Sequence, residues 1–235
     1  MNTTKAYKGM AMEGPVAAWY AKITNNEQRH RLVAEALAGD IPSGSNVLEI
    51  APGPGYFSIE LARLGDRHSP VGAPRNAEAR TGEWSITGLD ISKSFVEIAR
   101  KNAEQAGVKV DFRHGNAADM PFADGSFDFT FCQAAFKNFT EPVKAITEMY
   151  RVLRPNGASV IIDLRSDASK DEIERHIESL GLNSFNRLMT KWTFQNFLLK
   201  NAYTIPEMEA FIAQTPFRKY QVDLDDIGFT LRLEK

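Results

Sequence analysis

One stretch of the chain combines an acid with two closely spaced glycines, residues 46–55, Asn-Val-Leu-Glu-Ile-Ala-Pro-Gly-Pro-Gly. Its first half is a short apolar run, which predicts a buried parallel strand that Glu49 interrupts just before a turn. Gly53 and Gly55 let the backbone of that turn come close to a ligand, and the pattern that follows predicts a helix ending at Gly65. Strand, glycine turn and helix are typical of the first half of a nucleotide-binding βαβ unit, whose ligand lies beyond the carboxyl end of the strand.

The same stretch limits which nucleotide is expected. A dinucleotide fingerprint has a third glycine that gives close packing of the helix on the sheet, and this sequence has Ser58 in its place. A phosphate-binding loop of the form G-x-x-x-x-G-K-[ST] does not occur in the sequence. An NAD-binding domain is therefore a disfavoured alternative.

A second acid, Asp90, stands at the end of the next predicted strand, residues 84–90. A carboxylate at this place can accept hydrogen bonds from both ribose hydroxyls of an adenosine. The spacing from glycine turn to acid is usually about 20 residues, and residues 66–83, which we predict to be a long surface loop, account for the excess here. Helix signals begin at Ser92 and end at Gly107, so strand, acid and helix follow in the expected order.

Three segments together resemble class I S-adenosylmethionine-dependent methyltransferases of the small-molecule type. Residues 49–55, E-I-A-P-G-P-G, are similar to the acid-x-G-x-G-x-G of that family, with Ala51 in place of the first glycine, a mild change if its φ is negative. Residues 115–122, G-N-A-A-D-M-P-F, resemble the family's G-D-A-x-x-L-P-F. Residues 148–157, E-M-Y-R-V-L-R-P-N-G, resemble its helix and tight turn before the fifth strand, and the resemblance covers about residues 45–165.

The resemblance implies the cofactor S-adenosylmethionine, whose product is S-adenosylhomocysteine. Glu49 would orient the methionine end, and Asp90 would bind the ribose. Asn116, in place of the family's acid, would accept from the adenine amino group, Ala117 would offer its N–H to the ring, and Met120 would lie on the adenine face. The expected cofactor-binding residues are Glu49, Ala51, Gly53, Gly55, Asp90, Ile91, Asn116, Ala117, Met120 and Gln133.

The activity that the resemblance implies is in-line transfer of a methyl group to a small organic acceptor, at an oxygen, nitrogen or carbon atom that the sequence does not distinguish. The methyl group is already activated on a sulfonium, so the protein has mainly to hold the reacting atoms in line. A general base is needed only if the acceptor is protonated in its reactive state. Tyr7, Tyr20, Lys137 and Asp163 are candidate bases, and the sequence singles out none of them.

Two segments outside the core are expected to shape the acceptor site. In the resembling family the N-terminal segment often folds over the active site, so Tyr7, Trp19 and Tyr20 either form a lid or pack the N-terminal helices onto the domain. Residues 167–200 are predicted to be helical and stand where related enzymes build a substrate cap. The expected substrate-binding residues are Tyr7, Tyr20, Phe136, Phe185, Met189 and Trp192.

Two alternative functions stay open. The chain could methylate a protein side chain, or it could bind the cofactor without methyl transfer, because Ala51 departs from the motif and no base stands out. The N-P-P-Y motif of amino-methylating nucleic-acid enzymes is not in the sequence. Turnover with candidate acceptors separates these classes, since a binding module would give none.

These expectations define an α/β fold, a Rossmann-like doubly wound sheet of seven strands, mostly parallel, with an antiparallel last strand. A single methyltransferase domain is expected over residues 1–235. Its expected parts are an N-terminal helical lid over 1–44, a cofactor-binding core over 45–165, a helical cap insertion over 166–204, and a C-terminal helix and hairpin over 205–235.

Composition narrows the class of partner. The 235 residues carry a net charge of −2, with 43% hydrophobic and 25% charged residues, so neither nucleic-acid nor membrane binding is expected. The single cysteine, Cys132, rules out an internal disulfide and a cysteine-based zinc site, and we expect no metal. No run reaches 18 apolar residues and the N-terminus lacks the apolar core of a signal peptide, so we expect a cytoplasmic protein; its oligomeric state stays open.

Overall fold

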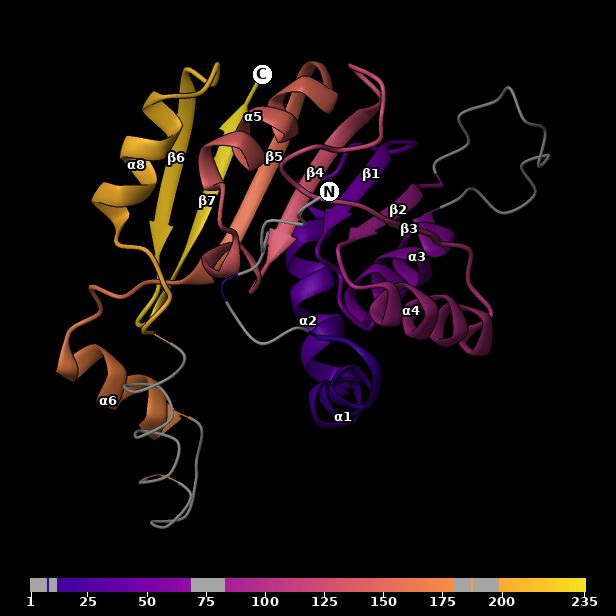
Figure 1. Ribbon diagram of the computed structural model, residues 1–235, viewed down its shortest axis with the longest axis horizontal. Helices are drawn as coiled ribbons and strands as arrows, with labels where there is room; N and C mark the ends of the chain where they lie inside the picture. Colours follow the sequence, from indigo (N-terminus) through magenta and orange to yellow (C-terminus); the bar gives the residue numbers. More distant parts are fainter. Residues whose placement is uncertain (1–7, 9–11, 69–82, 180–186, 188–198) are drawn as a thin grey trace.

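The computed structural model describes Lys8, residues 12–68, residues 83–179, Arg187 and residues 199–235. Figure 1 shows a seven-stranded sheet with helices packed on both of its faces. The strands are β1 (Asn46–Ile50), β2 (Ser85–Asp90), β3 (Asp111–His114), β4 (Phe127–Gln133), β5 (Leu153–Leu164), β6 (Lys219–Leu224) and β7 (Gly228–Glu234). The helices are α1 (Gly14–Thr24), α2 (Glu27–Ala38), α3 (Tyr56–His68), α4 (Lys93–Ala106), α5 (Pro142–Val152), α6 (Lys170–Ser179) and α8 (Ile205–Ala213), with a short 3-10 helix over Phe136–Asn138.

The strand order is β3-β2-β1-β4-β5-β7-β6. Strands β1 to β5 pair in parallel, β7 runs antiparallel to β5, and β6 runs antiparallel to β7. The sheet and its C-terminal hairpin confirm the predicted fold. Because β1 lies between β2 and β4, the order reverses at its carboxyl end, and open sheets of this kind bind their ligands at such a point.

The central strand β1 is buried on both faces. Val47 belongs to a buried cluster that includes Leu37 of α2 and Phe57 of α3, whereas Leu48 belongs to a second cluster that includes Ile146 of α5 and Met208 of α8. Successive side chains of a strand point to opposite faces, so helices pack against β1 on both sides. This packing fixes the position at which the turn after β1 begins.

Several helix ends follow the local signals that predict them. Ser92 caps α4 by accepting a hydrogen bond from the backbone N–H of Phe95, and Gly107 ends that helix with a φ of +68°. Thr204 and Glu207 form a complete capping box at the start of α8. These boundaries confirm the predicted helix after Asp90 and the predicted C-terminal helix.

Helix α2 is capped by a different residue from the one that local spacing indicates. Thr24 and Glu27 have capping-box spacing, but Asn26 caps the helix, accepting from the N–H of Arg29 at 3.1 Å. Thr24 Oγ1 instead donates to the carbonyl of Tyr20 at 2.8 Å, within the last turn of α1. Because α1 ends at Thr24 and α2 begins at Glu27, the threonine belongs to the first helix. The spacing of Thr24 and Glu27 alone does not show to which helix the threonine belongs.

The glycine expected to end α3 lies inside the helix. Helix α3 continues through Gly65 to His68. A Cβ added at Gly65 would lie 3.3 Å from the ring of Trp84, so a small residue is favoured there by the close approach of the tryptophan before β2. The glycine therefore serves packing rather than helix termination.

Part of the predicted cap is described. Helix α6 packs through Ile173 and Ile177, in a small cluster with Leu199 and Ile227 of the C-terminal part. Several predicted features lie outside the described residues: Tyr7, Phe185, Met189, Trp192 and residues 69–82 of the predicted surface loop.

Candidate cofactor and acceptor site

The turn after β1 has a backbone that favours glycine. Gly53 and Gly55 have φ values of +55° and +79°, in the left-handed region. Gly55 also has no room for a side chain, because an added Cβ would lie 2.6 Å from the ring of Phe112 and 2.8 Å from Ala99 Cβ. These two positions let α3 begin directly beyond the end of β1.

Ala51 has a positive φ as well, +59°, so the condition for a mild replacement of the family's first glycine, a negative φ, is not met. An L-residue in this region costs roughly 1–2 kcal/mol. The N–H of Ala51 donates to the carbonyl of Leu89 at 2.8 Å, which ties the start of the turn to β2. Strain of this kind clusters at functional sites, where the surrounding structure enforces it.

Asp90 joins the tip of β2 to the glycine turn. Its Oδ2 accepts from the N–H of Gly53 at 2.9 Å and its Oδ1 from the N–H of Ser92 at 2.8 Å. The residue is 5% exposed, and burial raises the pKa of its carboxyl group to about 6 although both backbone hydrogen bonds lower it. At neutral pH the group is mainly a carboxylate, and each oxygen keeps lone-pair capacity for a donor such as a ribose hydroxyl.

Glu49 lies behind the turn, between β1 and α3. Its carboxyl group accepts a hydrogen bond from Ser58 Oγ, and both residues are buried. Burial raises the pKa of Glu49 to about 8, against the lowering effect of Ser58, and the nearby charge of Asp90 raises it further. Glu49 is therefore mainly protonated at neutral pH, and Ser58, which replaces the dinucleotide glycine, has a defined partner. Contact of Glu49 with the methionine end stays a prediction.

The loop after β3 is fixed by its own hydrogen bonds. The N–H of Gly115 donates to the carbonyl of Asp90 at 2.9 Å, so the loop begins beside the predicted ribose-binding acid. Asn116 Oδ1 accepts from the N–H of Ala118 at 3.0 Å. The amide oxygen thus uses one lone pair within the loop and keeps one for the adenine amino group that the resemblance implies.

The remaining predicted cofactor residues differ in exposure. Ile91, next to Asp90, is 40% exposed, which leaves an apolar side chain open to a ring. Ala117 and Gln133 are half-buried, with Gln133 as the last residue of β4. Met120 is 3% exposed and belongs to the core cluster on the α5 side of the sheet.

Lys137 forms a buried ion pair with Asp163. Its Nζ lies 2.8 Å from Asp163 Oδ1 and donates to the carbonyl of Ala134 at 2.6 Å. The carboxylate also accepts from the N–H groups of Lys137 and Leu164, at 2.8 and 2.7 Å. An ammonium group held in this way carries no lone pair, so Lys137 is a poor general base here. The pair instead holds the loop after β4.

The aromatic side chains beside this loop form a buried cluster. Phe136 is fully buried, and its ring centroid lies 5.2 Å from that of Phe139 and 6.1 Å from that of Tyr203. The ring of Tyr203 also lies 4.9 Å from Phe211, edge to face. Phe136, expected to contact the substrate, lies in the core cluster of the described structure, and its contact with substrate stays a prediction.

The chain before α1 binds the part of the site that follows β4. The backbone N–H of Lys8 donates to the carbonyl of Asn138 at 2.8 Å. Lys8 Nζ donates to Tyr203 Oη, and Tyr203 Oη in turn donates to the carbonyl of Phe139 at 3.1 Å. We call Lys8 and the pair Met12–Glu13 the two anchors of the N-terminal strap.

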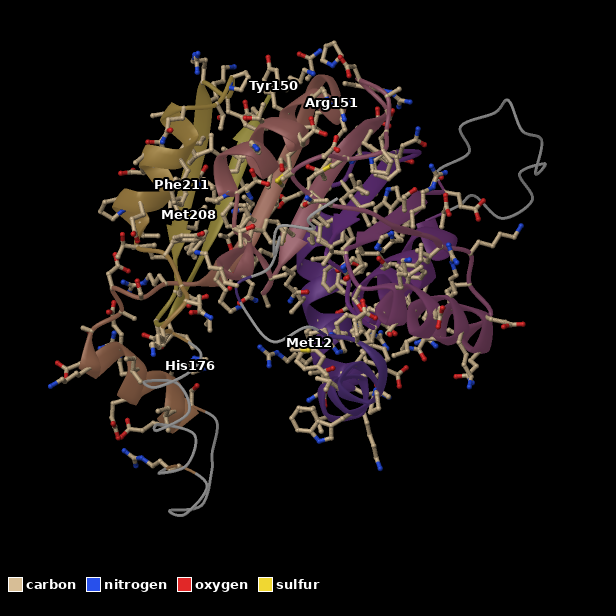
Figure 2. The ribbon with its side chains drawn as sticks, viewed as in Figure 1. Met12, Tyr150, Arg151, His176, Met208 and Phe211 are labelled. Atoms are coloured by element: carbon tan, nitrogen blue, oxygen red, sulfur yellow. The ribbon has the colours of Figure 1, made fainter. Side chains whose placement is uncertain are left out.

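The second anchor binds the start of α4, and Figure 2 shows Met12 where the chain approaches α1. Ser92 Oγ donates to the carbonyl of Met12. Glu13 accepts from the N–H groups of Lys93 and Ser94, at 3.0 and 3.1 Å, two helix-end donors that have no partner within the helix. Because Asn138 follows β4 and Ser92 follows β2, the anchors lie on either side of the turn after β1.

The two aromatic residues of α1 behave differently. Tyr20 packs against α4, with its ring centroid 5.8 Å from that of Phe95, and burial raises the pKa of its phenol above the usual value. The phenol stays protonated at neutral pH, so it is a poor base. Trp19 is 61% exposed and does not pack α1 onto the domain.

Sequence reasoning missed Lys8, Glu13 and Tyr203. Lys8 and Tyr203 are 195 residues apart, and no local pattern joins them. Glu13 precedes Gly14 and Pro15, a helix-start signal, but that signal does not tell which other helix the acid caps.

A hollow of about 310 Å³ lies at the amino-terminal ends of β1, β2 and β4, beside Asn46, Ser85 and Phe127. The glycine turn lies at the opposite end of β1. In the described ranges, no three His, Cys, Asp or Glu side chains gather as metal ligands. No helix within those ranges is long and apolar enough to cross a membrane.

Comparison with known proteins shows what the chain is similar to. Residues 48–161 match a family model described as a methyltransferase domain. This part of the chain therefore resembles a methyltransferase domain, in agreement with the sheet order. The family match spans the glycine turn, Asp90, the loop after β3, and α5 with most of β5.

Curated relatives of this chain are similar to it over part of their length. A demethylmenaquinone methyltransferase of Deinococcus radiodurans is 32% identical over 141 residues, 60% of this chain and 51% of that protein. One of Listeria welshimeri is 32% identical over 124 residues, 52% of this chain and 46% of that protein. The chain thus spans about half the length of the curated relatives it matches.

Solved structures share the fold over nearly the whole chain. A SAM-dependent methyltransferase from Aquifex aeolicus has a TM-score of 0.67 at 18% identity, over 92% of this chain and 97% of that one. A protein from Methanococcus maripaludis, proposed to be an S-adenosyl-L-methionine-dependent methyltransferase, has a TM-score of 0.70 at 21% identity, over 100% of this chain and 96% of that one.

Proposed function

We propose that this protein transfers a methyl group from S-adenosylmethionine to a small organic acceptor. The observation that carries the proposal is the carboxylate of Asp90, buried at the end of β2 and hydrogen-bonded to Gly53 of the glycine turn. This hydrogen bond places a carboxylate that could bind the two ribose hydroxyls next to a backbone that can approach a ligand closely. Both lie at the point where the strand order reverses.

The residues present fit this cofactor. Asp90 would accept hydrogen bonds from the ribose hydroxyls, Ile91 and Asn116 would meet the adenine, and the turn from Ala51 to Gly53 would face the methionine end. S-adenosylmethionine, when bound, supplies a methyl group on a sulfonium that is already activated for displacement. The chain's own task is to hold the acceptor in line and to keep water away.

Charge at the site favours a cationic nucleoside over a dinucleotide. Asp90 borders the turn as a carboxylate, and the negative strap residue Glu13 lies close enough to raise the pKa of Asp90. A pyrophosphate would add two negative charges beside these acids, whereas a sulfonium and an ammonium group would offset them. The acids therefore disfavour NAD on grounds independent of the motif.

We propose that the acceptor is small and partly aromatic. The loop after β4, where an acceptor would meet the cofactor, is bordered by Phe139 and Tyr203, and Lys8 binds it at Asn138. The relatives named above are demethylmenaquinone methyltransferases, which makes a ring acceptor a reasonable first choice. Lys137 is tied to Asp163, so the described residues contribute by orientation and desolvation rather than through an evident base.

One observation favours a second candidate, a domain that binds the cofactor without transferring its methyl group. Ala51 keeps a strained φ where the resembling family has glycine, and its Cβ takes up room at the methionine end. Such a domain would bind S-adenosylmethionine and S-adenosylhomocysteine and give no turnover with any acceptor.

Calorimetric titration of the whole protein with S-adenosylmethionine, S-adenosylhomocysteine and NAD tests the proposal. We expect the two sulfur nucleotides to bind and NAD not to bind. The variant Asp90→Asn should weaken them by about 10- to 100-fold, since a hydrogen bond to a charged group is worth about 1.5–3 kcal/mol. Asp111→Asn, a surface change on β3, is the matched control and should leave affinity unchanged.

Turnover is then measured with a panel of phenols, quinols and amines and with a protein extract, using radiolabelled S-adenosylmethionine. Methylation of small molecules supports the proposal. Label that appears only in protein supports the alternative of a protein methyltransferase, and binding without any transfer supports the second candidate. Binding of NAD alone would overturn the proposal.

A further inference from the structure

The loop that would bind the adenine is hydrogen-bonded to side chains of α5. Met120 closes this loop, and both polar groups of its backbone are bound by side chains of that helix. Its N–H donates to Glu148 Oε2 at 2.7 Å, and its carbonyl accepts from Arg151 Nη2 at 3.0 Å. The sheet supplies neither partner.

Arg151 makes further contacts with the same loop. Its Nη1 donates to the carbonyl of Phe122 at 2.8 Å and lies 2.7 Å from Asp124 Oδ1. Its Nε and Nη2 also donate to the two oxygens of Glu148, each at 2.7 Å. The planar guanidinium thus holds one helix carboxylate and three points of the loop, which a single ammonium group could not do.

The loop has no regular structure of its own in this region. Residues 120–126 belong to no helix or strand, so the contacts with Glu148 and Arg151 act together with the burial of the Met120 side chain to hold them in place. The Glu148 pKa lies below its usual value, chiefly because of its hydrogen bond with Arg151. The carboxylate of Glu148 therefore stays charged at neutral pH, so its hydrogen bonds with Arg151 and with the N–H of Met120 are present at that pH.

We infer that Arg151 and Glu148 are positioning residues for the adenine: by fixing Met120 they hold Asn116 and Ala117 where the base binds. This inference rests on the proposed function. It assigns a role in ligand binding to a part of the helix that otherwise only leads into β5. Figure 2 shows Arg151 at the end of α5, so its effect on the ligand passes through the loop.

The helix itself does not depend on these two side chains. Helix α5 is held in the core by four buried residues on its other face: Ala145, Ile146, Met149 and Val152. A substitution at Arg151 should therefore release the loop and leave the helix in place.

The test compares two arginines three residues apart. Arg151 and Arg154 have side chains that are 29% and 30% exposed, and each is paired with an aspartate. Arg154 reaches the carbonyl of Gly125 and Asp128 and makes no described contact with Met120. Arg154→Met is thus a matched control for Arg151→Met in exposure, size and lost charge.

The ligands are S-adenosylhomocysteine and S-ribosylhomocysteine, which lacks the base, titrated into the whole protein after circular dichroism and melting have shown that each variant folds. We expect Arg151→Met to weaken S-adenosylhomocysteine by about tenfold or more and to leave S-ribosylhomocysteine within about twofold. Arg151→Lys should recover little, because it keeps the charge and loses the fork. Arg154→Met should change neither affinity.

A double-mutant cycle provides a second measurement. In an Asn116→Ala background, Arg151→Met should cost much less S-adenosylhomocysteine affinity than it does alone, because both changes act on the same contact. Equal weakening of both ligands by Arg151→Met, no weakening of either, or full additivity with Asn116→Ala would overturn the inference. If the unaltered protein binds neither S-adenosylmethionine nor S-adenosylhomocysteine, the proposed function fails instead.

Discussion

Buried acids dominate the site at the scale of single residues. Glu49 and Asp90 both have pKa values above their usual range, mainly because they are buried. A raised pKa of an acid means that the folded state binds the proton more tightly than the unfolded state does. The stability that this provides is complete below the unfolded pKa and is lost as the pH rises through the folded pKa.

Glu49→Gln should stabilise the protein in a pH-dependent way. For Glu49 the window runs from about 4.5, its ordinary pKa, to about 8. The variant should match the unaltered protein near pH 4.5 and exceed it increasingly up to about pH 8, by at most about 1.4 kcal/mol per pH unit. Urea unfolding at several pH values measures this. Glu35→Gln, at an exposed ion pair with Arg31, is the control and should show no such trend.

Ala51→Gly should raise stability, because the residue has a φ of +59°. Relief of left-handed strain is worth about 1–2 kcal/mol, and the greater freedom of glycine in the unfolded chain removes about 0.5–1 kcal/mol of it. The net gain in the free energy of unfolding should be about 0.5–1 kcal/mol. Ala18→Gly, on the exposed face of α1, should instead lower it by about 1 kcal/mol. Equal signs for the two variants would contradict the strain at Ala51.

At the scale of elements, the loop after β4 depends on the ion pair of Lys137 and Asp163.

Local signals predict the ends of helices well when they act over a few residues, as at Ser92 and Gly107. They do not predict side-chain contacts between distant elements, such as those of Lys137 with β5 or of Arg151 with Met120. The sequence therefore marked Lys137 as a possible base, although the fold gives it a partner that occupies it.

Lys137→Met should destabilise the protein by about 3–5 kcal/mol, since it leaves a buried carboxylate without its cation. The double variant Lys137→Met/Asp163→Asn should recover part of that loss. Thermal unfolding of the single and double variants measures this. Below its melting temperature, the single variant should keep turnover within about threefold, because the lysine only holds the loop. A loss of turnover far larger than this, with the fold intact, would restore Lys137 as a catalytic candidate.

At the scale of the whole molecule, the sheet and its order follow from the sequence, and the strap does not. Alternating strand and helix patterns with short turns leave few topologies to choose from. The anchors at Lys8 and Glu13 depend on which surfaces lie opposite one another after folding. The sign of φ at Ala51, on which its interpretation depended, could not be predicted for the same reason, because a φ value is set by the whole turn and not by one residue type.

Glu13→Ala should speed the release of S-adenosylhomocysteine. The variant removes the acceptor of two N–H groups at the start of α4, which is worth about 1 kcal/mol, so the dissociation rate should rise about fivefold. Stopped-flow displacement of the bound nucleotide measures that rate. Glu35→Ala, remote from the strap, should leave it unchanged, and an unchanged rate in Glu13→Ala would mean that this anchor does not retain the ligand.

The position of the strap in the chain sets an order of assembly during synthesis. Ribosomes make the N-terminus first, but Lys8 binds a tyrosine 195 residues further on. The first anchor therefore has to wait while β1 to β5 and the helix between β4 and β5 are made. The newly made chain therefore passes through a stage in which the glycine turn and Asp90 are already made and the anchor at Lys8 has not yet formed.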